Sequence, residues 1–351
     1  VYQQEVAEYV KASKQSLVNT EKKIQRGTLK NGIQYALYPT STRDDKTYAT
    51  ISIDFGTEKS LFNQGEVLDL MAYLLLRGSD QYSLQDIADK SIEAGGGATA
   101  TANAAGNSIT IQIVAKKEKF ADYFKFMLEV LKKPKFEQSQ FDLIKSQSLS
   151  ALDRPYTEPE TVAALTMTRL LETYQPGDLR YHFEPELSKQ QIKAATVEQV
   201  KKLYQNFFVS NHAQIAITGD YQAKAMLKIL QKEFGAWKAQ LPYQRLSSDY
   251  QAYPAQKVHA LSEQREFGNY QSILTFPVGA NHPDTPALVV FGYILGDSQL
   301  SSRLAQELRE KNALVYGFGS TLNLDDWINS GALAIEANYT AGKSAQVSQG
   351  V

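Results

Sequence analysis

Histidine and cysteine, the side chains that most often bind zinc, are scarce in this chain of 351 residues. Cysteine is absent, which excludes disulfide frameworks, thiolate zinc sites and cysteine nucleophiles. The four histidines are His182, His212, His259 and His282. A zinc site on one helix needs two histidines four residues apart, and no two of these lie that close. A metal site built from carboxylates alone stays open, although no calcium-binding loop of the EF-hand type is present.

Two other kinds of catalytic motif are missing as well. The run Gly95-Gly96-Gly97 lacks the Lys and Ser/Thr of a phosphate-binding loop and is interpreted as a turn that leads into a strand. No G-x-S-x-G nucleophile elbow occurs, which argues against an independent serine hydrolase. The residues alone therefore point to no complete active site.

The composition is that of a folded globular protein. Hydrophobic residues make up 43 % of the chain, and 37 Lys and Arg against 38 Asp and Glu leave a formal net charge of −1. A balanced charge gives no electrostatic reason to bind nucleic acid or anionic lipid. No apolar run reaches the roughly 18 residues of a membrane span, so a soluble protein is expected. The opening residues, Val1 to Glu5, do not resemble a signal peptide, and the lack of an initial Met leaves open a fragment with its targeting segment elsewhere.

Hydrophobic periodicity predicts the elements that would position any site. Residues 1–25 are interpreted as an exposed helical linker with a thin apolar stripe. Strands are predicted at 33–38 and 48–55, followed by an apolar core helix at 65–76 that ends at Arg77-Gly78. Further helices are predicted at about 83–94, 117–132, 137–153, 158–173, 196–207 and 222–234, and further strands at 98–103, 108–115 and 213–218.

The pattern then restarts after a second linker at 240–256. Tyr270 to Gly279 repeats Tyr48 to Gly56 at an offset of 222 residues, and Asn329 repeats Asn107 at the same offset. We interpret this as a duplication, with a first domain at 26–240 and a second at 255–351 that lacks roughly a hundred residues at its C-terminus. Strands joined by hairpins, with helices gathered after them, predict an α+β fold of two α/β sandwich domains with largely antiparallel sheets covered by helices.

Several motifs in fixed order carry a family resemblance. They are Leu29-Lys30-Asn31-Gly32-Ile33, Leu76-Arg77-Gly78-Ser79, Gly96 to Asn103, Thr218-Gly219-Asp220 and, most specific, the stretch from Leu295-Gly296-Asp297 through Ser301-Ser302-Arg303-Leu304 and Glu307-Leu308-Arg309-Glu310-Lys311 to Leu314-Val315-Tyr316. Together they resemble the pitrilysin/insulinase family of zinc metallopeptidases, the inverzincins. This family includes mitochondrial processing peptidases and the core subunits of the respiratory bc1 complex.

The same resemblance implies that this chain lacks the zinc site of the active halves. Active halves carry H-x-x-E-H on the first core helix, where the two His bind zinc and the Glu activates water. In this chain Asp69 and Tyr73 stand at the positions of the two His, and Ala72 stands at the position of the Glu. Ser150 stands near the position of the third ligand, a Glu. The simplest interpretation makes these positions vestigial, with Tyr73 packed and Asp69 facing solvent, and no metal is expected in this chain.

The resemblance implies that this chain contributes to the active site what the half without zinc contributes in the family. In the family that half supplies an Arg and a Tyr seven residues apart, which correspond here to Arg309 and Tyr316. A phenol can donate to the oxyanion of peptide hydrolysis, and a guanidinium can hold substrate carbonyls. Without the resemblance, we would expect Arg309 to lie at a solvated helix end and Tyr316 to pack in the core.

Two hypotheses follow from the resemblance. In the first, the chain is the non-catalytic, C-terminal half of a zinc metalloendopeptidase and is inactive alone. Zinc and H-x-x-E-H then lie in a homologous partner half, in the same chain or a separate subunit, and the two halves enclose a peptide substrate. In the second, the chain is an inert structural or interaction subunit resembling the bc1 core proteins. Retention of Arg309 and Tyr316, and the absence of a glycine-rich loop around Gly279 to Pro286, argue against the second. Long bacterial members are commonly exported, which implies the periplasm.

Overall fold

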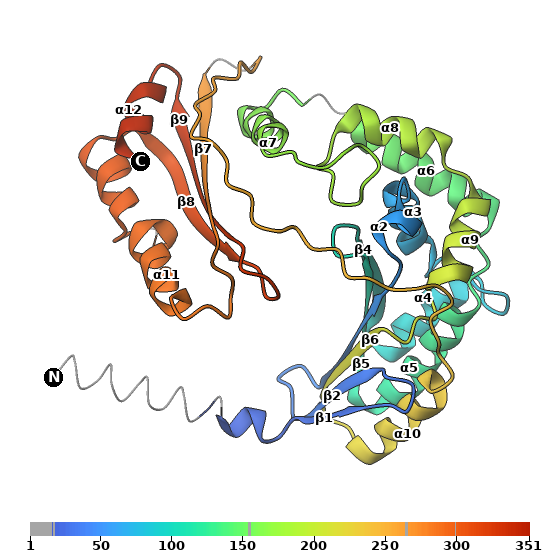
Figure 1. Ribbon diagram of the computed structural model, residues 1–351. Coiled ribbons are helices and arrows are strands. Elements are labelled where there is room, and N and C mark those ends of the chain that lie inside the picture. The colour runs from blue at the N-terminus through green and yellow to red at the C-terminus, as the bar shows by residue number, and fades with distance from the viewer. Residues whose placement is uncertain (1–15, 17, 154–155, 264–265, 299) are drawn as a thin grey trace. The chain divides into compact units, whose positions relative to one another are not determined.

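The protein is described from a computed structural model that covers residues 16, 18–153, 156–263, 266–298 and 300–351 (Figure 1). The chain divides into two compact units. The first comprises residues up to Ala151 together with Pro176–Leu179 and Ser188–Leu246. The second comprises Leu152–Gln175, Arg180–Leu187 and Ser247–Val351. No helix in the described part of the chain combines the length and the apolar character that crossing a membrane requires.

The first unit is built on a six-stranded sheet. Its strands lie in the order β1-β2-β6-β3-β5-β4, and every pair is antiparallel except β2 with β6. Alternating isoleucines such as Ile51 and Ile111 put one face of this sheet into the core. The strands are β1 (Gln25–Thr28), β2 (Gln34–Pro39), β3 (Lys46–Asp54), β4 (Gly97–Asn103), β5 (Ser108–Lys116) and β6 (Ala213–Gly219).

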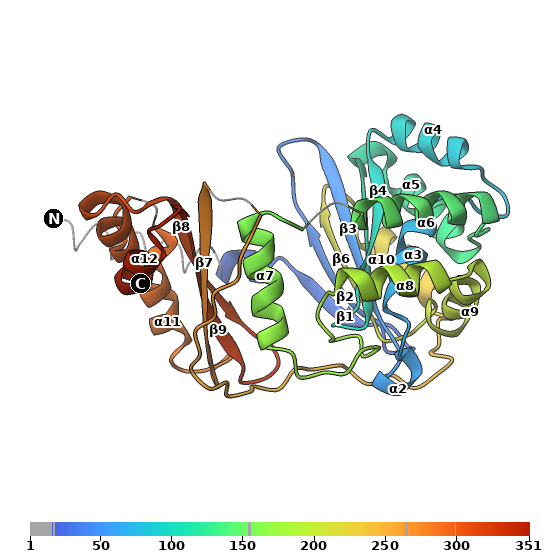
Figure 2. The same cartoon turned by 90° about the horizontal axis from the view of Figure 1, so that it is seen from above.

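Helices cover the apolar face of this sheet, as Figures 1 and 2 show. The central one, α3, buries Val67, Leu68 and Met71 and packs against α9 and β4. One continuous hydrophobic core joins these helices to the sheet. The helices of this layer are α2 (Glu58–Leu61), α3 (Gly65–Leu74), α4 (Leu84–Ala94), α5 (Lys117–Lys132), α6 (Gln138–Leu152), α8 (Pro185–Ala194), α9 (Val197–Phe207) and α10 (Ala223–Phe234).

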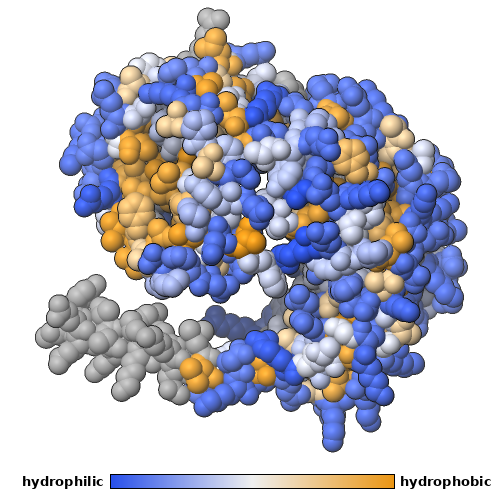
Figure 3. Space-filling model, viewed as in Figure 1, coloured by the Kyte–Doolittle hydropathy of each residue, from blue (hydrophilic) through white to orange (hydrophobic). Residues whose placement is uncertain are grey.

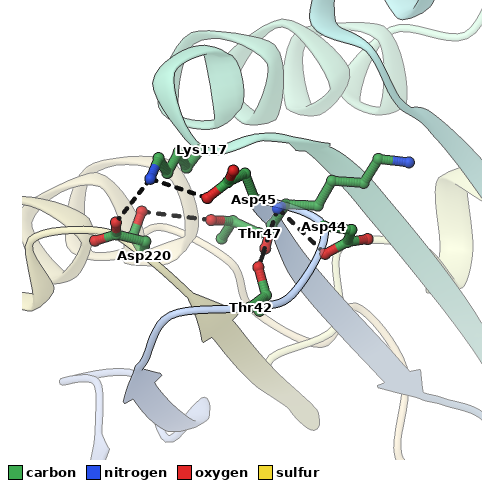
Figure 4. A network of polar contacts seen from close by, with 7 residues as sticks. Thr42, Asp44, Asp45, Thr47, Lys117 and Asp220 are labelled. Carbon is green, nitrogen blue, oxygen red and sulfur yellow. Dashed lines mark hydrogen bonds and ion pairs between the residues drawn. The ribbon is translucent and has the colours of Figure 1, made fainter.

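A polar network fixes one end of this sheet and gives the Thr218-Gly219-Asp220 motif a structural role (Figure 4). Lys117, the first residue of α5, forms ion pairs with Asp45 at 3.1 Å and with Asp220 at 3.4 Å. Gly219 has a φ of +136°, and a Cβ there would collide with Thr47. The glycine and the charged pair therefore hold the end of β6 against the start of β3.

The second unit is built on a three-stranded antiparallel sheet in the order β7-β9-β8. A smaller core, which includes Leu304, Leu308 and Phe318, lies between one face of the sheet and the helices that follow the strands. Helix α7 packs against β7. The elements are α7 (Pro159–Leu170), β7 (Phe267–Phe276), α11 (Thr285–Gly292), β8 (Val315–Leu324), β9 (Gly331–Thr340) and α12 (Ser344–Gly350), with two π-helical segments, η1 (Tyr293–Asp297) and η2 (Ala305–Lys311).

The predicted fold class, α+β with largely antiparallel sheets, is confirmed. The strand order β7-β9-β8 matches β3-β5-β4 of the first unit, with β9 and β5 each central between two antiparallel neighbours. This shared order supports the duplication and the division into two homologous domains, which we keep as a proposal.

Local differences from the predicted elements are few. Strand β1 and helices α2 and α8 were not predicted, because all three are short and lack a clear apolar period. Of the predicted N-terminal helix, residues 18–21 are helical and Gln25 already belongs to β1, while residues 1–15 and 17 lie outside the described part.

Candidate functional site

The positions that would hold zinc in an active half lie on α3 and α6. Ala72 is buried, whereas Asp69 on α3 and Ser150 on α6 are exposed. Tyr73, for which packing was the simpler expectation, is instead 59 % exposed. The helix buries its apolar residues against the sheet and α9, so its remaining positions face outward whatever residue they carry.

Asp69 has a perturbed carboxyl group. Although its side chain reaches solvent, the protein packed around the carboxylate partly desolvates it, and the negative charge of Glu66 one turn away adds to this effect, so the pKa of Asp69 rises to about 6. Burial also raises the pKa of Glu66, against a hydrogen bond with Ser188 that lowers it. Among the described residues, no group of three or more His, Asp or Glu side chains could hold a metal ion. The donor set at these positions therefore does not fit zinc.

Arg309 extends from η2 into solvent. The core side of this segment is formed by Ala305 and Leu308, which leaves Arg309 on the exposed side. Within the described residues its guanidinium makes no hydrogen bond or ion pair, whereas its neighbours Glu307 and Lys311 pair with each other at 3.0 Å. A guanidinium without an internal partner keeps all five N–H donors available to a ligand.

Tyr316 is the extra residue of a β-bulge. Val315 pairs with Tyr339 and Gly317 pairs with Asn338, so no residue of β9 stands opposite Tyr316. The bulge keeps both Val315 and Phe318 on the core face and turns Tyr316 to the opposite face, where it is 56 % exposed. In a regular strand Tyr316 and Phe318 would share the core face.

The phenol is held in place by its neighbours on the outer face of the sheet. The ring of Phe267 meets the ring of Tyr316 edge-on at 5.5 Å. The hydroxyl lies 3.2 Å from the hydroxyl of Thr340, which is the register partner of Phe267. Gly317 and Gly319 follow on the same strand, and a Cβ added to either would meet no atom within 4 Å. The Tyr316 hydroxyl therefore borders an open stretch of sheet.

One tight corner connects the two predicted site residues. The amide of Ala313 donates to the carbonyl of Arg309 at 3.1 Å, and the amide of Leu314 donates to the carbonyl of Leu308 at 2.8 Å. Ala313 has a φ of +45°, a conformation that costs energy for any residue with a Cβ. The π-helical end, the corner and the bulge thus follow one another within twelve residues, from Ala305 to Tyr316.

Sequence reasoning did not single out Phe267 or Thr340. Both become neighbours of Tyr316 only through strand register, which a single sequence does not contain. One local signal was available, since Val315 and Phe318 are apolar at an odd spacing and regular alternation would put them on opposite faces.

Comparisons with known proteins agree with this architecture. The family model described as peptidase M16 inactive domain matches residues 194–351. None of the curated proteins matches the chain in sequence.

Among solved structures, the peptidase M16 inactive domain from Pseudomonas fluorescens is 18 % identical, with a TM-score of 0.71 over 93 % of this chain and 78 % of that one. A protease from Helicobacter pylori is 17 % identical, with a TM-score of 0.72 over 93 % of this chain and 77 % of that one.

The periplasmic protease PqqL from Escherichia coli is 14 % identical, with a TM-score of 0.64 over 91 % of this chain but only 35 % of that one. At these identities the three structures show a shared fold. Together with the family model, which matches residues 194–351, they confirm the predicted resemblance to the pitrilysin-type peptidases: this stretch of the chain matches the M16 inactive domain, and the chain shares the fold of the M16 inactive-domain structure.

Proposed function

We propose that this chain completes the peptide-binding chamber of a zinc metalloendopeptidase whose catalytic half lies elsewhere, in the same polypeptide or in a separate subunit. On that half, zinc would activate the water that attacks the peptide bond. This chain would contribute Arg309 as a contact to substrate carbonyls and Tyr316 as a hydrogen-bond donor to the oxyanion. It would be inactive towards peptides when alone.

The observation that carries the proposal is the state of these two side chains. Arg309 has no internal partner among the described residues, and Tyr316 is turned out of its sheet by a bulge. Neither arrangement adds much to the stability of the fold, because exposed side chains bury little surface and form few strong contacts. Strained or irregular backbone held at both positions is typical of functional sites.

The chemistry of the two groups suits peptide hydrolysis. The tetrahedral intermediate carries a negative oxygen that needs a positioned donor, and Tyr316 is held by Phe267 at its ring and by Thr340 at its hydroxyl. An extended peptide presents carbonyl oxygens at regular intervals, which an arginine fork can bind in pairs. Strand β8 has a single neighbour in the described sheet, so its other edge has the geometry that pairs with an extended peptide.

The compartment belongs to the same proposal. PqqL, which shares the fold, is described as a periplasmic protease. We propose the periplasm for this chain as well.

A reconstitution experiment tests the proposal. The zinc-bearing half would be mixed with or fused to this chain, and cleavage of a fluorogenic peptide would be followed with and without a chelator. We expect no cleavage by this chain alone and chelator-sensitive cleavage by the combination. Arg309→Ala should raise KM about tenfold or more through the loss of a charged hydrogen bond to substrate, while Arg303→Ala, an exposed arginine of the same unit, should not.

Two results would contradict the proposal. Cleavage by this chain alone that a chelator abolishes would mean that it holds its own catalytic metal. A combination that forms but cleaves no faster than the zinc half alone would favour an inert structural subunit, the second hypothesis from the sequence.

A further inference from the structure

The two faces of the three-stranded sheet in the second unit differ in chemical character. Figure 3 shows hydrophobic side chains gathered over α11, which packs on β8 at the core face. On the opposite face, which we call the outer face, Glu160 of α7 accepts hydrogen bonds from Gln271 of β7 and Asn338 of β9. The polar side chains that β7 and β9 present on the outer face include Asn269, Gln271, Glu336, Asn338 and Thr340.

Strand β8 leaves the middle of the outer face bare. Its residues there are Gly317 and Gly319, which lie opposite Asn338 and Glu336 of β9. A Cβ added to either glycine would meet no atom within 4 Å, and neither glycine has a positive φ. Neither packing nor backbone conformation therefore accounts for these glycines, although glycine weakens a strand and often marks the close approach of a ligand. We call Gly317 and Gly319 the glycine strip.

The carboxylate of Glu336 is oriented by an amide network. Asn269 donates through Nδ2 to Glu336 at 2.8 Å and to Oδ1 of Asn338 at 2.7 Å, and Asn338 donates to Glu160 at 2.7 Å. Neither Glu160 nor Glu336 forms an ion pair with another described residue. The buried Oδ1 of Asn269 also has no hydrogen-bond partner in that part of the chain. The network thus has more acceptors than donors, and a donor-rich cation would complete it.

The spacing of strands decides which side chains of a bound peptide can reach Glu336. A peptide paired with the free edge of β8 would lie two strand spacings, about 9.5 Å, from β9. A long side chain can span this distance, because Gly319 places no side chain in its path. Lysine has a flexible four-carbon stem that ends in an ammonium group, and arginine ends in a planar fork that matches a carboxylate.

The position of Glu336 along the sheet also indicates which residue of the peptide it would contact. Its register partner Gly319 lies three residues beyond Tyr316 on β8. A peptide paired with β8 advances at nearly the same rise per residue as the strand itself. A side chain that reaches Glu336 would therefore belong to a residue about three positions from the peptide bond held at Tyr316.

We propose that Glu336 determines substrate specificity by selecting peptides with a lysine or arginine about three residues from the scissile bond. The stem of that side chain would lie across the glycine strip, and its charged end would bind the carboxylate of Glu336. This inference rests on the proposed function, because it takes the peptide to pair with β8 and to be cleaved beside Tyr316.

A matched peptide series cleaved by the complete enzyme, with the zinc half fused to or mixed with this chain, tests the proposal. The peptides would differ at one position, which carries Lys, Glu or norleucine, a neutral residue with an aliphatic stem. That position would be moved through the residues on both sides of the scissile bond. This chain would be wild type, Glu336→Gln or Gly319→Val, and Glu129→Gln, the same exchange at an exposed position of α5, is the matched control.

We expect the wild-type enzyme to prefer Lys over norleucine by at least about tenfold in kcat/KM, and only at a position about three residues from the scissile bond, because norleucine cannot form the charged hydrogen bond. Glu336→Gln should reduce this preference to under about threefold and leave cleavage of the norleucine peptide unchanged. Gly319→Val should also remove the preference, because its side chain would block the path to Glu336. Glu129→Gln should keep it.

Two results would overturn this inference and leave the proposed function standing. One is a Lys preference that survives Glu336→Gln, and the other is an enzyme that cleaves the norleucine peptide but prefers Lys at no position. If the complete enzyme cleaves none of the peptides, the proposed function fails, and the binding of labelled peptides to this chain alone decides the inference. Equal affinity for the Lys and norleucine peptides would overturn it, whereas at least about tenfold tighter binding of the Lys peptide, abolished by Glu336→Gln, would support it.

Discussion

Replacing Tyr316 by Phe removes one hydroxyl and isolates the chemistry assigned to it. The edge-to-face contact with Phe267 at 5.5 Å involves only the ring and survives the change. The lost hydrogen bond, to Thr340 at 3.2 Å, is exposed to solvent. An exposed hydrogen bond contributes about 0.5 kcal/mol at most, so the folded structure and its stability should hardly change.

The expected effect on catalysis is much larger. A donor aimed at the oxyanion interacts strongly only when the negative charge has formed, so its loss acts on the transition state. Removing one such donor costs about 10²–10³ in kcat, or roughly 2.7–4 kcal/mol of barrier. KM should stay within about threefold, because the neutral carbonyl of the bound substrate depends little on the donor.

The assay needs the complete enzyme, with the zinc half fused to or mixed with this chain. Steady-state kinetics on a peptide would give kcat and KM, metal analysis would give the zinc content, and thermal unfolding would report stability. Tyr73→Phe is the matched control, because Tyr73 is exposed to nearly the same extent and has no role in the proposed mechanism.

A kcat within about threefold of the wild-type value would refute the oxyanion role of Tyr316. A large rise in KM at unchanged kcat would refute it as well, since the hydroxyl would then bind substrate and transition state equally. A loss of zinc would mean that the change acts on the metal site of the other half.

Two further predictions concern the first unit. Asn107 is fully buried, donates to the carbonyls of Phe55 at 2.8 Å and Gln244 at 3.1 Å, and accepts from the amide of Leu246 at 3.1 Å. Asn107→Ala should therefore destabilise the protein by about 3 kcal/mol in denaturant unfolding, whereas Asn103→Ala, at an exposed position, should cost under about 1 kcal/mol; equal effects would contradict the role of Asn107. The pKa of Asp69 is raised to about 6, so its ionisation disfavours the folded state as pH rises from about 4 to about 6. Asp69→Asn should raise the melting temperature at pH 8 and leave it unchanged below pH 4, and an equal shift at both pH values would show that ionisation is not the cause.

The sequence predicts the larger elements well, for a physical reason. Strand β3 alternates strictly and α3 carries an apolar stripe, and both patterns arise from burying one side of an element in a core. Helix α8 escapes prediction because its ten residues contain few large apolar side chains. Strand β1, with the sequence Gln-Arg-Gly-Thr, is short and polar and exists because it pairs with β2.

In the candidate site, too, some features could be predicted from the sequence and others could not. The positions of Asp69, Tyr73, Arg309 and Tyr316 follow from motif spacing, which is a property of the sequence. The exposure of Tyr316 does not follow from motif spacing, because it depends on a bulge created by the pairing of β8 with β9. Side-chain partners across strands, such as Thr340, depend on register and become visible only in three dimensions.

We propose that a zinc site was lost at these positions while the rest of the fold persisted, and the arrangement of α3 is compatible with this. On α3 the buried residues Val67, Leu68 and Met71 build the core, while Asp69 and Tyr73 stand outside it. Exchanging ligands at those exposed positions removes metal chemistry and leaves the packing free energy nearly intact. The same logic applies to Arg309 and Tyr316, which are also outside the core, so stability places no demand on their identity either. We therefore propose that this arginine, which has no internal partner among the described residues, and the bulged tyrosine seven residues later serve to bind a ligand and not to stabilise the fold.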